Sequence, residues 1–429
     1  MARLIFTNPG GCDAAPDQRQ AQPVPCNPAL QSLATARRVL LLQGPVGPFF
    51  DRLTHWLMAN GASVHRVVFH AGDARDCSAC EPIRFQGGLE DWPAFFSDLL
   101  VQWSIDAVVL FGQSRKHHGQ AIRQARESGV TTIVLEEGYI RPGFITIELN
   151  GVHGLSRTLD EYQWEPEAPG VAVEAARQTA KQDQFWSMAR HACRQYRDLY
   201  WAPAVSRGYQ HHRPTEIWYH SRYWVWSWVY KHMRMLPYSA LVRSLNESPY
   251  CFVPLQHEGD SQITHHSPYP EINALIHDVL RSFAAHAPRS TRLVLKTHPH
   301  ARGGPSYRPL MRRLTQQLGI QDRVMYLVEG HTPTLVENAD GVVLINSTVG
   351  VQALARGKPL AVLGQAVYKR PGLYFDGELD EFWNEAPSPD DAHVRRFLEE
   401  LIALAQVPCQ VYAKADEPLL AGPAAAHLK

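Results

Sequence analysis

The sequence predicts an α/β protein built from two doubly wound halves, each a parallel sheet with helices on both faces. Two observations predict this fold class. Short apolar runs alternate with segments of helical spacing in two separate parts of the chain, residues 37–170 and 247–390. The length of 429 residues also exceeds what one ordinary hydrophobic core accommodates. We therefore expect two Rossmann-like domains.

The first half begins with an apolar run that ends in the Gly/Pro loop of residues 44–48. Helical spacing of Phe49, Leu53 and Leu57 follows, and Gly61 ends this helix. The same alternation continues to residue 136. The expected strands are Val39–Gln43, Val64–Phe69, Ala107–Phe111 and Thr132–Glu136, and the expected helices are Phe49–Asn60, Trp92–Trp103 and Gln120–Ser128.

The second half shows the strand–helix–strand pattern most clearly over Gly341–Gly364. An apolar run stops at Asn346, a helix-compatible segment follows the turn, and Gly357 with Pro359 precedes a second apolar run. The expected strands are Cys251–Leu255, Val294–Lys296, Val324–Val328, Val342–Ile345 and Leu360–Leu363. The expected helices are Glu271–Ala285, Tyr307–Leu318, Thr334–Ala339 and Val349–Arg356.

Three further segments flank or separate the halves. Residues 1–36 are rich in Pro, Gln and Ala without periodicity, which predicts a loose N-terminal tail and order from Arg38 onward. Residues 171–246 are rich in aromatic side chains and are expected to form a helical insert between the domains. Residues 391–429 are expected to hold a last helix, ending near Ala405, and a tail.

Composition excludes several classes of function. Lys+Arg and Asp+Glu balance at 42 each, so no global field favours nucleic acid. Seven cysteines are scattered, and the only close pair, Cys77 and Cys80, lacks the second pair of a zinc site, which predicts plain loop thiols. We expect no bound metal and no cofactor. No signal peptide and no apolar stretch of about 20 residues is evident, which predicts a cytoplasmic or membrane-peripheral protein.

Polar clusters follow the expected strands directly. In open α/β sheets, ligands bind beyond the carboxyl ends of the strands. We therefore expect these clusters to line a cleft that the two domains face. The clusters are Gln43–Pro48, Gly112–His118 and Glu136–Pro142 in the first half, and Gln256–Ser267, Thr297–Arg302, Glu329–His331 and Asn346–Gly350 in the second.

Glu136 and Glu137 stand together at the end of an expected buried strand. Adjacent side chains of a strand point to opposite faces, so only one of the two is expected to face the cleft. Gly138 permits the following turn, and Arg141 is a candidate ligand for an anion. A strand end with solvated acids is the alternative interpretation.

Two clusters of the second half suit a phosphate. Lys296 and His298 supply positive or hydrogen-bonding groups, and Pro299 holds the residue before it extended. The turn Asn346–Thr348 places polar groups at the expected start of a helix. Since both clusters end strands of one sheet, they predict a nucleotide-phosphate pocket. The alternatives are a buried core histidine at position 298 and simple capping of the helix by the turn.

The segment Ile217–Leu236 holds four tryptophans beside arginine and lysine residues. This combination is typical of an interfacial helix against anionic lipid. A helix packed on its own domain shows the same aromatic content, and the pattern leaves both interpretations open.

Short motifs along residues 38–385 also resemble one family, the KpsS/LipB-type capsular polysaccharide proteins, which are bacterial retaining β-Kdo transferases of the GT-B architecture. No single motif is specific, but their occurrence together in this order is. The motifs are Leu42–Phe50, Glu136–Pro142, Pro254–Gln256, Asp260–Gln262, His298–Pro299, Asn346–Leu354, Tyr368 and Pro371–Leu373.

The resemblance implies roles for individual residues. Related two-module capsule Kdo transferases have Glu-Asp-Gly-Phe where this chain has Glu136-Glu137-Gly138-Tyr139, so Glu137 takes the position of the nucleophilic Asp with a side chain one methylene longer. The catalytic candidates are Glu137, Glu136 and His118. The donor-binding candidates are Gln256, Asp260, Ser261, Gln262, Lys296, His298, Pro299, Asn346, Ser347, Thr348 and Gly350. The candidates for the sugar or acceptor are Gln43, Gly44, Arg115, His117 and Arg141.

The resemblance implies transfer of β-Kdo with retention from CMP-β-Kdo to a phosphatidylglycerol-type lipid at the inner face of the cytoplasmic membrane, with capsule assembly and export proteins as partners. Glu137 would attack the anomeric carbon, and His117, His118 or Glu136 would assist the acceptor hydroxyl. Two alternatives remain: a GT-B transferase with another nucleotide sugar, and a non-catalytic scaffold of the capsule assembly complex.

Overall fold

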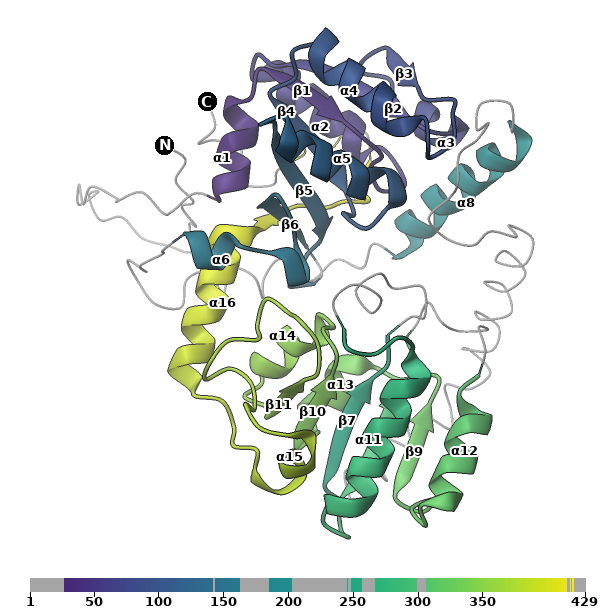
Figure 1. The fold of residues 1–429 in the computed structure, drawn as a ribbon, viewed down its shortest axis with the longest axis vertical. Coiled ribbons are helices and arrows are strands. Elements are labelled where there is room, and N and C mark those ends of the chain that lie inside the picture. The colour runs from purple at the N-terminus through teal and green to yellow at the C-terminus, as the bar shows by residue number, and fades with distance from the viewer. Residues whose placement is uncertain are drawn as a thin grey trace, which may run out of the picture. The chain divides into compact units, whose positions relative to one another are not determined.

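The computed structural model describes residues 27–141, 143–162, 185–202, 245, 248–256, 267–298, 306–414, 417 and 419. The chain divides into two compact units, Met1–His212 with Glu399–Lys429, and Arg213–Leu398. Each unit contains one sheet and its helices (Figure 1). The predicted fold class, two α/β halves with largely parallel sheets, is confirmed. The predicted boundaries near residues 170 and 246 fall outside the described residues and stay predictions.

The first sheet has seven strands in the order β12-β6-β5-β4-β1-β2-β3. Their bounds are β1 Arg38–Leu41, β2 Ser63–Val68, β3 Pro82–Arg84, β4 Ala107–Phe111, β5 Thr131–Glu137, β6 Phe144–Leu149 and β12 Gln406–Pro408. The five strands from β5 to β3 run parallel, as predicted, whereas β6 and β12 add antiparallel pairs. The link from β5 to β6 is too short for a crossover, and a parallel pair requires one.

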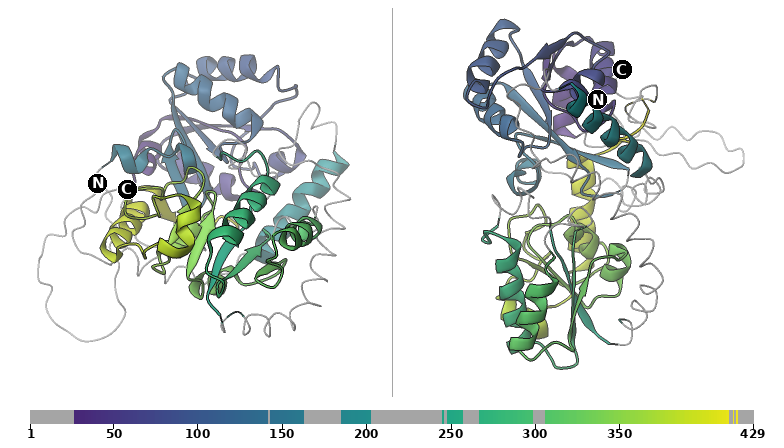
Figure 2. Two further views of the ribbon diagram at one scale, coloured as in Figure 1. Left: turned by 60° about the horizontal axis from the view of Figure 1, so that its bottom comes forward. Right: turned by 90° about the vertical axis from the view of Figure 1, so that its right-hand side faces the viewer.

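Helices cover both faces of this sheet (Figures 1 and 2). Helices α1 (Pro28–Thr35) and α2 (Phe49–Ala59) share a hydrophobic cluster with Val39, Val109 and Leu135. Helices α4 (Trp92–Gln102) and α5 (Lys116–Glu127) share another with Leu110 and Val134. Successive strand residues alternate between the two clusters, which explains why the buried central strands are apolar throughout.

Helix α1 corrects one prediction, because order begins before Arg38. Asn27 caps this helix: its Oδ1 accepts from Leu30 N at 2.9 Å, and its Nδ2 donates to Ile147 O at 3.0 Å. Pro28 occupies the first helical turn, and Leu33 is buried. The Asn-Pro start was a readable helix signal, but eight residues within a Pro-rich stretch gave no periodicity to support it.

Shorter elements complete the first unit. They are α3 (Ala71–Arg75), the 3-10 turn η1 (His153–Leu155), α6 (Thr158–Glu161) and α8 (Phe185–Trp201). Of the expected helical insert, residues 185–202 and 245 are described, and helix α8 within it packs on α3, where Arg75 pairs with Asp198. The segment Ile217–Leu236 lies outside the described residues, so its interfacial interpretation stays a prediction.

The second sheet has five parallel strands in the order β11-β10-β7-β8-β9. They are β7 Tyr250–Pro254, β8 Arg292–Lys296, β9 Val324–Leu327, β10 Gly341–Leu344 and β11 Leu360–Val362. Helices α11 (Ile272–His286), α12 (Arg308–Gln317) and α15 (Leu379–Glu385) share one hydrophobic cluster on this sheet. Helices α13 (Thr332–Glu337) and α14 (Val349–Leu354) contact β7 and β10 from outside that cluster. All five predicted strands and four predicted helices are confirmed, with ends shifted by a few residues.

The C-terminal segment returns to the first sheet. Helix α16 (Asp391–Ala405) confirms the predicted last helix, and the boundary between the units falls within it. Strand β12 then pairs with β6, and Val407, Cys409 and Val411 are buried in the first unit. The expected tail is therefore wrong for residues 406–411. None of the described helices has the length and apolar character needed to cross a membrane.

Candidate functional site

The first candidate site is the carboxyl edge of the first sheet. Four neighbouring parallel strands, β5, β4, β1 and β2, end there. The polar residues that follow them contact one another: Arg115 Nη1, beyond β4, donates to Gly44 O at 3.0 Å and to Gln43 O at 3.3 Å, beyond β1. The structure therefore brings together the predicted residues Gln43, Gly44 and Arg115.

Glu136 and Glu137 point to opposite faces, as predicted. In β5, Val134 belongs to the cluster under α4 and α5, and Leu135 to the cluster under α1 and α2. Glu136 comes two residues after Val134 and therefore points to the same face of the sheet as Val134. A Cβ on Gly112 would lie 3.6 Å from Glu136 Oε2 and 3.5 Å from Arg115 Nε, so the carboxylate and the guanidinium meet over this glycine. Gly112 has a φ of 81° and could not carry a side chain without strain.

Glu137 lies on the other face and is held by two partners. Its Oε2 pairs with Arg141 Nη1 at 2.6 Å, and its Oε1 accepts from Tyr412 Oη at 2.9 Å. Burial and the neighbouring Glu137 charge raise the pKa of Tyr412 well above its usual value, so the phenol remains a donor. The carboxylate is thus oriented and about a third exposed, at 35%. Tyr412 comes from the expected C-terminal tail, which is why sequence reasoning missed it.

The turn after β5 requires glycine at position 138. A Cβ there would lie 2.6 Å from Phe144 O and 2.7 Å from Ile140 O, both backbone atoms that cannot move aside. Arg141 Nε donates to Gly138 O at 2.9 Å, which ties the turn to the partner of Glu137. Arg141, predicted to bind an anion, is therefore engaged with Glu137 in this structure.

The two candidate histidines are placed inside the fold. His118 is fully buried; its Nδ1 lies 2.8 Å from Gly112 O, and its Nε2 accepts from Gln43 N at 3.3 Å. Burial, with the Arg115 charge, lowers its pKa well below the usual value. Both ring nitrogens therefore serve the backbone, and we no longer include His118 among the candidate bases. His117 packs among Phe69, Phe85 and Trp92, and burial lowers its pKa to about 4.

A buried network around Gln43 was missed by sequence reasoning. Gln43 Nε2 donates to Asp73 Oδ2 at 3.0 Å and lies 3.0 Å from His70 Nε2. Gln195 Nε2, from α8, lies 3.1 Å from the same ring nitrogen. A Cβ on Gly47 would lie 2.8 Å from the ring of His191, so α8 also packs on the loop after β1. No local motif links residues of three separate segments.

The second candidate site is the carboxyl edge of the second sheet. Neighbouring strands β10, β7 and β8 lead to Asn346, Gln256 and His298 respectively. Gln256 Nε2 donates to Asn346 Oδ1 at 2.8 Å, with both side chains buried. Lys296 is buried as well, and its Nζ donates to Thr297 O at 3.3 Å. His298 is half-buried, so it is not the fully buried core histidine of the alternative interpretation.

The turn before α14 is shaped by Tyr368. The Tyr368 hydroxyl donates to Ser347 O at 2.5 Å, and a Cβ on Gly350 would lie 2.4 Å from Tyr368 Cζ. Ser347 Oγ accepts from Val349 N at 3.3 Å, whereas the Thr348 side chain makes no cap. Capping by Ser347 therefore occurs, and helix α14 has only six residues. The phosphate role of this turn stays a prediction.

Four donor-site candidates lie outside the described residues: Asp260, Ser261, Gln262 and Pro299. Among the described residues, no group of three or more His, Cys, Asp or Glu side chains is arranged to hold a metal ion. The expectation of a metal-free site is not tested by this arrangement.

Comparison with known proteins identifies the family. The family model described as "Capsule polysaccharide biosynthesis protein" matches residues 106–412. The chain belongs to this capsule polysaccharide biosynthesis family. The Escherichia coli "Capsule polysaccharide export protein KpsS" is 35% identical over 392 residues, covering 90% of this chain and 99% of that protein. The Neisseria meningitidis serogroup B "Capsule polysaccharide modification protein LipB" is 34% identical and covers 83% of this chain and 87% of its own length.

Solved structures of similar architecture include "Thermosulfurimonas dismutans KpsC, beta Kdo 2,7 transferase", at 14% identity and a TM-score of 0.39 over 86% of this chain and 89% of that one. The predicted resemblance to the KpsS/LipB-type proteins is thus confirmed by the relatives of known sequence. The chain is thus a member of the capsule polysaccharide biosynthesis family, and it folds into two α/β units with largely parallel sheets.

Proposed function

We propose that this protein transfers β-Kdo, with retention, from CMP-β-Kdo to a (lyso)phosphatidylglycerol acceptor and so initiates the poly-Kdo linker of capsular polysaccharide. The observation that carries the proposal is Glu137, a partly exposed carboxylate at the end of β5 that Arg141 and Tyr412 hold in one orientation. A retaining transferase that works by double displacement needs such a carboxylate as its nucleophile.

In the proposed reaction, a Glu137 carboxylate oxygen attacks the anomeric carbon of Kdo, and the bond to the CMP phosphate oxygen breaks as CMP leaves. The acceptor hydroxyl then displaces the carboxylate and loses its proton to a base. Two inversions give net retention. Of the three candidate bases, Glu136 alone keeps a partly exposed side chain, because His117 and His118 are buried. Glu136, however, points to the opposite face of β5 from Glu137, so we assign the base to none of the three.

The donor proposal places the CMP phosphate at the carboxyl edge of the second sheet. Lys296 and His298 stand at the end of β8 and the turn Asn346–Thr348 follows β10, and these two strands flank β7. Positive and hydrogen-bonding groups can stabilise the charge of the departing CMP directly, so we propose that no metal or other cofactor is required. The Gln256–Asn346 hydrogen bond supports the proposal because it fixes the two strand ends relative to each other.

The acceptor proposal requires the protein to reach a lipid surface from the cytoplasmic side. Helix α8 supports this. Trp186 and Trp201 are 69% and 76% exposed, and Arg190 and Arg197 are exposed between them. At 3.6 residues per turn these four side chains fall within roughly 60° of the helix circumference. The acid of α8, Asp198, is buried and pairs with Arg75 and also with Arg197, whose side chain is about half exposed at 54%. A Trp/Arg face of this kind suits the interface of an anionic membrane.

We propose capsule assembly and export proteins as partners, in line with the name of the Escherichia coli relative, and we propose no nucleic acid partner. The two alternative functions are a GT-B transferase that uses another nucleotide sugar and a non-catalytic scaffold of the capsule assembly complex. Another nucleotide sugar would use the same edge of the second sheet, and a scaffold would need no nucleophile. The oriented Glu137 favours a transferase over a scaffold, because a scaffold does not require a nucleophilic carboxylate.

One assay tests the proposal. Purified protein is incubated with CMP-Kdo and fluorescent lysophosphatidylglycerol, and products are identified by mass spectrometry. We expect a Kdo-lipid with retained configuration, unchanged by EDTA. Transfer from a different nucleotide sugar would replace the donor assignment. Absence of product with every donor, together with intact capsule function in a Glu137→Gln strain, would support the scaffold.

A further inference from the structure

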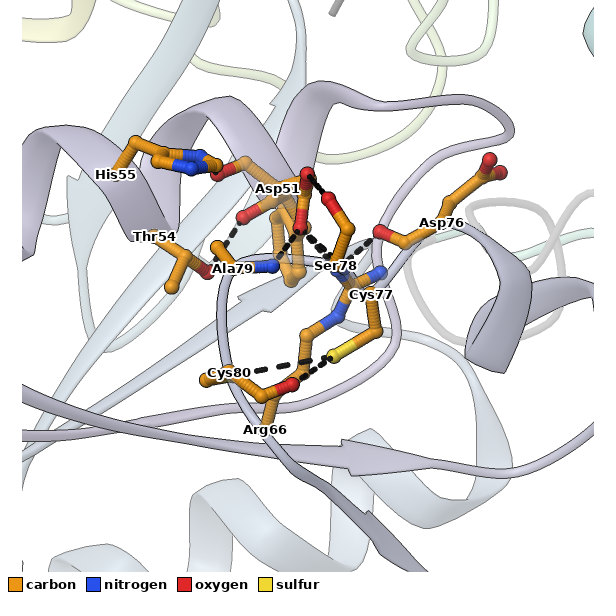
Figure 3. A network of polar contacts seen from close by, with 10 residues as sticks. Asp51, Thr54, His55, Arg66, Asp76, Cys77, Ser78, Ala79 and Cys80 are labelled. Atoms are coloured by element: carbon orange, nitrogen blue, oxygen red, sulfur yellow. Dashed lines mark hydrogen bonds and ion pairs between the residues drawn. The ribbon is translucent and has the colours of Figure 1, made fainter.

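Cys77 and Cys80 lie side by side in the turn between α3 and β3 (Figure 3). Their sulfur atoms are 3.8 Å apart, and Cys77 Sγ lies 3.4 Å from Cys80 O. Both side chains are partly exposed. A disulfide needs its sulfur atoms about 2.05 Å apart, so the two sulfur atoms must approach each other before they can bond.

A buried carboxylate holds the turn in this shape. Asp51, on α2, accepts from Ser78 N at 2.7 Å, from Ala79 N at 2.9 Å and from Ser78 Oγ at 2.6 Å. Ser78 and Ala79 are the two residues between the cysteines. Asp51 therefore fixes the backbone that separates the sulfur atoms, and it is only 6% exposed.

Arg66 anchors the turn from the other side. Its Nη1 donates to Asp76 O at 2.5 Å and lies 4.0 Å from Asp51 Oδ1 (Figure 3). Arg66 is buried, so its charge acts on the turn with little screening by water. The turn is thus built around a paired Asp and Arg instead of being an ordinary solvated loop.

The surroundings also favour the thiolate of Cys77. A hydrogen bond from Cys80 lowers the pKa of Cys77 to about 7, assisted by Arg66 and opposed by burial and by Asp51. By contrast, burial raises the pKa of Cys251 and of Cys409 to about 12. The thiolate is the nucleophile of thiol–disulfide exchange, so Cys77 is the residue that attacks.

We propose that Cys77 and Cys80 form a thiol–disulfide exchange site whose oxidant is a low-molecular-weight disulfide. The Cys77 thiolate attacks one sulfur of the oxidant and releases one thiolate, which gives a mixed disulfide. Cys80 then loses its proton and attacks the Cys77 sulfur, which releases the second thiolate. The oxidant gains two electrons and two protons, and the protein gains one Cys77–Cys80 disulfide. Both cysteines are free thiols in a turn, as the sequence predicts, and the exchange activity goes beyond that expectation.

The site adjoins the Gln43 network. Helix α3, directly before the turn, carries Asp73, which accepts from Gln43, and is capped by His70. Helix α2, which carries Asp51, follows the loop after β1. Cys77 therefore follows, by four residues, the Asp73 that binds the candidate acceptor residue Gln43.

The test uses full-length protein equilibrated in glutathione buffers from fully reduced to fully oxidised. Samples are quenched with acid, alkylated and mapped by mass spectrometry. We expect the peptide with both cysteines to lose two hydrogens and both alkylation sites together, reversibly. Cys80→Ser should stop at a glutathione adduct on Cys77, and Cys77→Ser should react at least about tenfold more slowly.

Cys193→Ser is the matched control, because Cys193 is an exposed free cysteine of α8. It should leave the Cys77–Cys80 reaction unchanged. Two outcomes would overturn the proposal: a wild-type protein that keeps glutathione on Cys77 without closing the disulfide, or one in which Cys193 reacts while Cys77 and Cys80 both remain alkylatable.

Discussion

At the scale of single residues, neighbours in one strand end have different chemical environments. Glu137 contacts Arg141 and Tyr412, whereas Glu136 lies over Gly112 with Arg115. The alternation of a β-strand alone produces this separation. Two carboxylates adjacent in sequence therefore cannot be treated as an acid/base pair, and their substitutions should differ.

Glu137→Gln should reduce turnover by at least about 100-fold, because the amide lacks the nucleophilic charge. Nucleotide binding should be retained. The free energy of unfolding should change little, because the Glu137–Arg141 ion pair that is lost is partly exposed. Gln can still accept a hydrogen bond from Tyr412. Glu136→Gln, the matched control, should cost less in rate. Single-turnover kinetics and a Kdo adduct trapped on the Glu137 peptide check this, and wild-type turnover in Glu137→Gln would refute the assignment.

Glu148 should give the first unit a pH-dependent stability. Burial raises the pKa of its carboxyl, although Tyr139 and Ser156 donate to it. Between the ordinary and the raised value, the native state keeps a proton that the unfolded state has released, so the free energy of unfolding falls as pH rises through this window. Glu148→Gln should flatten that slope in denaturant titrations, whereas Glu161→Gln, at an exposed site, should not. Equal slopes in wild type and Glu148→Gln would contradict this account.

At the scale of elements, the candidate residues depend on how strand ends and short helices pack. Tyr368 illustrates this, because its ring fills the space over Gly350 and its hydroxyl holds Ser347 O. The turn Asn346–Thr348 is therefore fixed by a side chain outside the strand–helix–strand unit formed by β10, α14 and β11. Helix α8 likewise positions His70 and the Gly47 loop from another part of the chain.

Gly350→Ala should destabilise the second unit by about 1–3 kcal/mol, because its Cβ would meet the fully buried Tyr368 ring at 2.4 Å. CMP binding should weaken with it, since Ser347 would move. Gly119→Ala in α5 is the control: its Cβ would meet nothing closer than 3.8 Å, so the helix should gain about 0.5–1 kcal/mol. Denaturant unfolding measures both, and an unchanged midpoint for Gly350→Ala would show that Tyr368 moves freely.

The α8 face should bind anionic lipid. Sedimentation with phosphatidylglycerol vesicles should recover most of the protein, and phosphatidylcholine vesicles should recover little. Arg190→Glu with Arg197→Glu should reduce recovery severalfold. The matched control reverses two exposed arginines of α12, Arg312→Glu with Arg313→Glu, and should leave recovery near wild type. An equal loss of vesicle recovery in both double variants would show that the net charge of the protein, and not the α8 face, determines lipid binding.

At the scale of the whole molecule, the two sheets divide the proposed work. The first carries the candidate nucleophile and the second carries the candidate phosphate ligands. Each sheet places its residues at the carboxyl ends of parallel strands, where ligands of such folds bind. The two units can therefore be tested separately. Turnover and the trapped Kdo adduct report on the first unit, and nucleotide binding reports on the second.

CMP should raise the melting temperature of the protein, since a ligand that binds only the native state stabilises it by mass action. UMP and GMP should raise it less. His298→Ala should abolish the CMP shift and leave the unliganded melting temperature nearly unchanged, and His277→Ala, at an exposed site of α11, should keep the shift. Equal shifts with all three nucleotides would remove the cytidine assignment. A large loss of unliganded stability in His298→Ala would make His298 a structural residue.

The sequence by itself determined the two α/β halves and most of their elements. Apolar runs and helical spacing are local signals, and the nine strands β1, β2, β4, β5 and β7 to β11 and the main helices show them strongly. The edge strand β3, which has no buried residue, was not predicted. The sequence also placed the candidate residues at strand ends and separated Glu136 from Glu137, because alternation is a property of the strand itself.

Only the tertiary structure decided which neighbours those residues have. Tyr412 reaches Glu137 across 275 residues, Tyr368 holds Ser347 across 21, and both ring nitrogens of His118 serve the backbone. Strands β6 and β12, helix α1 and the Cys77–Cys80 turn likewise depend on distant partners such as Ile147 and Asp51. Such contacts carry no periodicity along the chain, because packing joins residues by their distance in space and not by their separation in sequence.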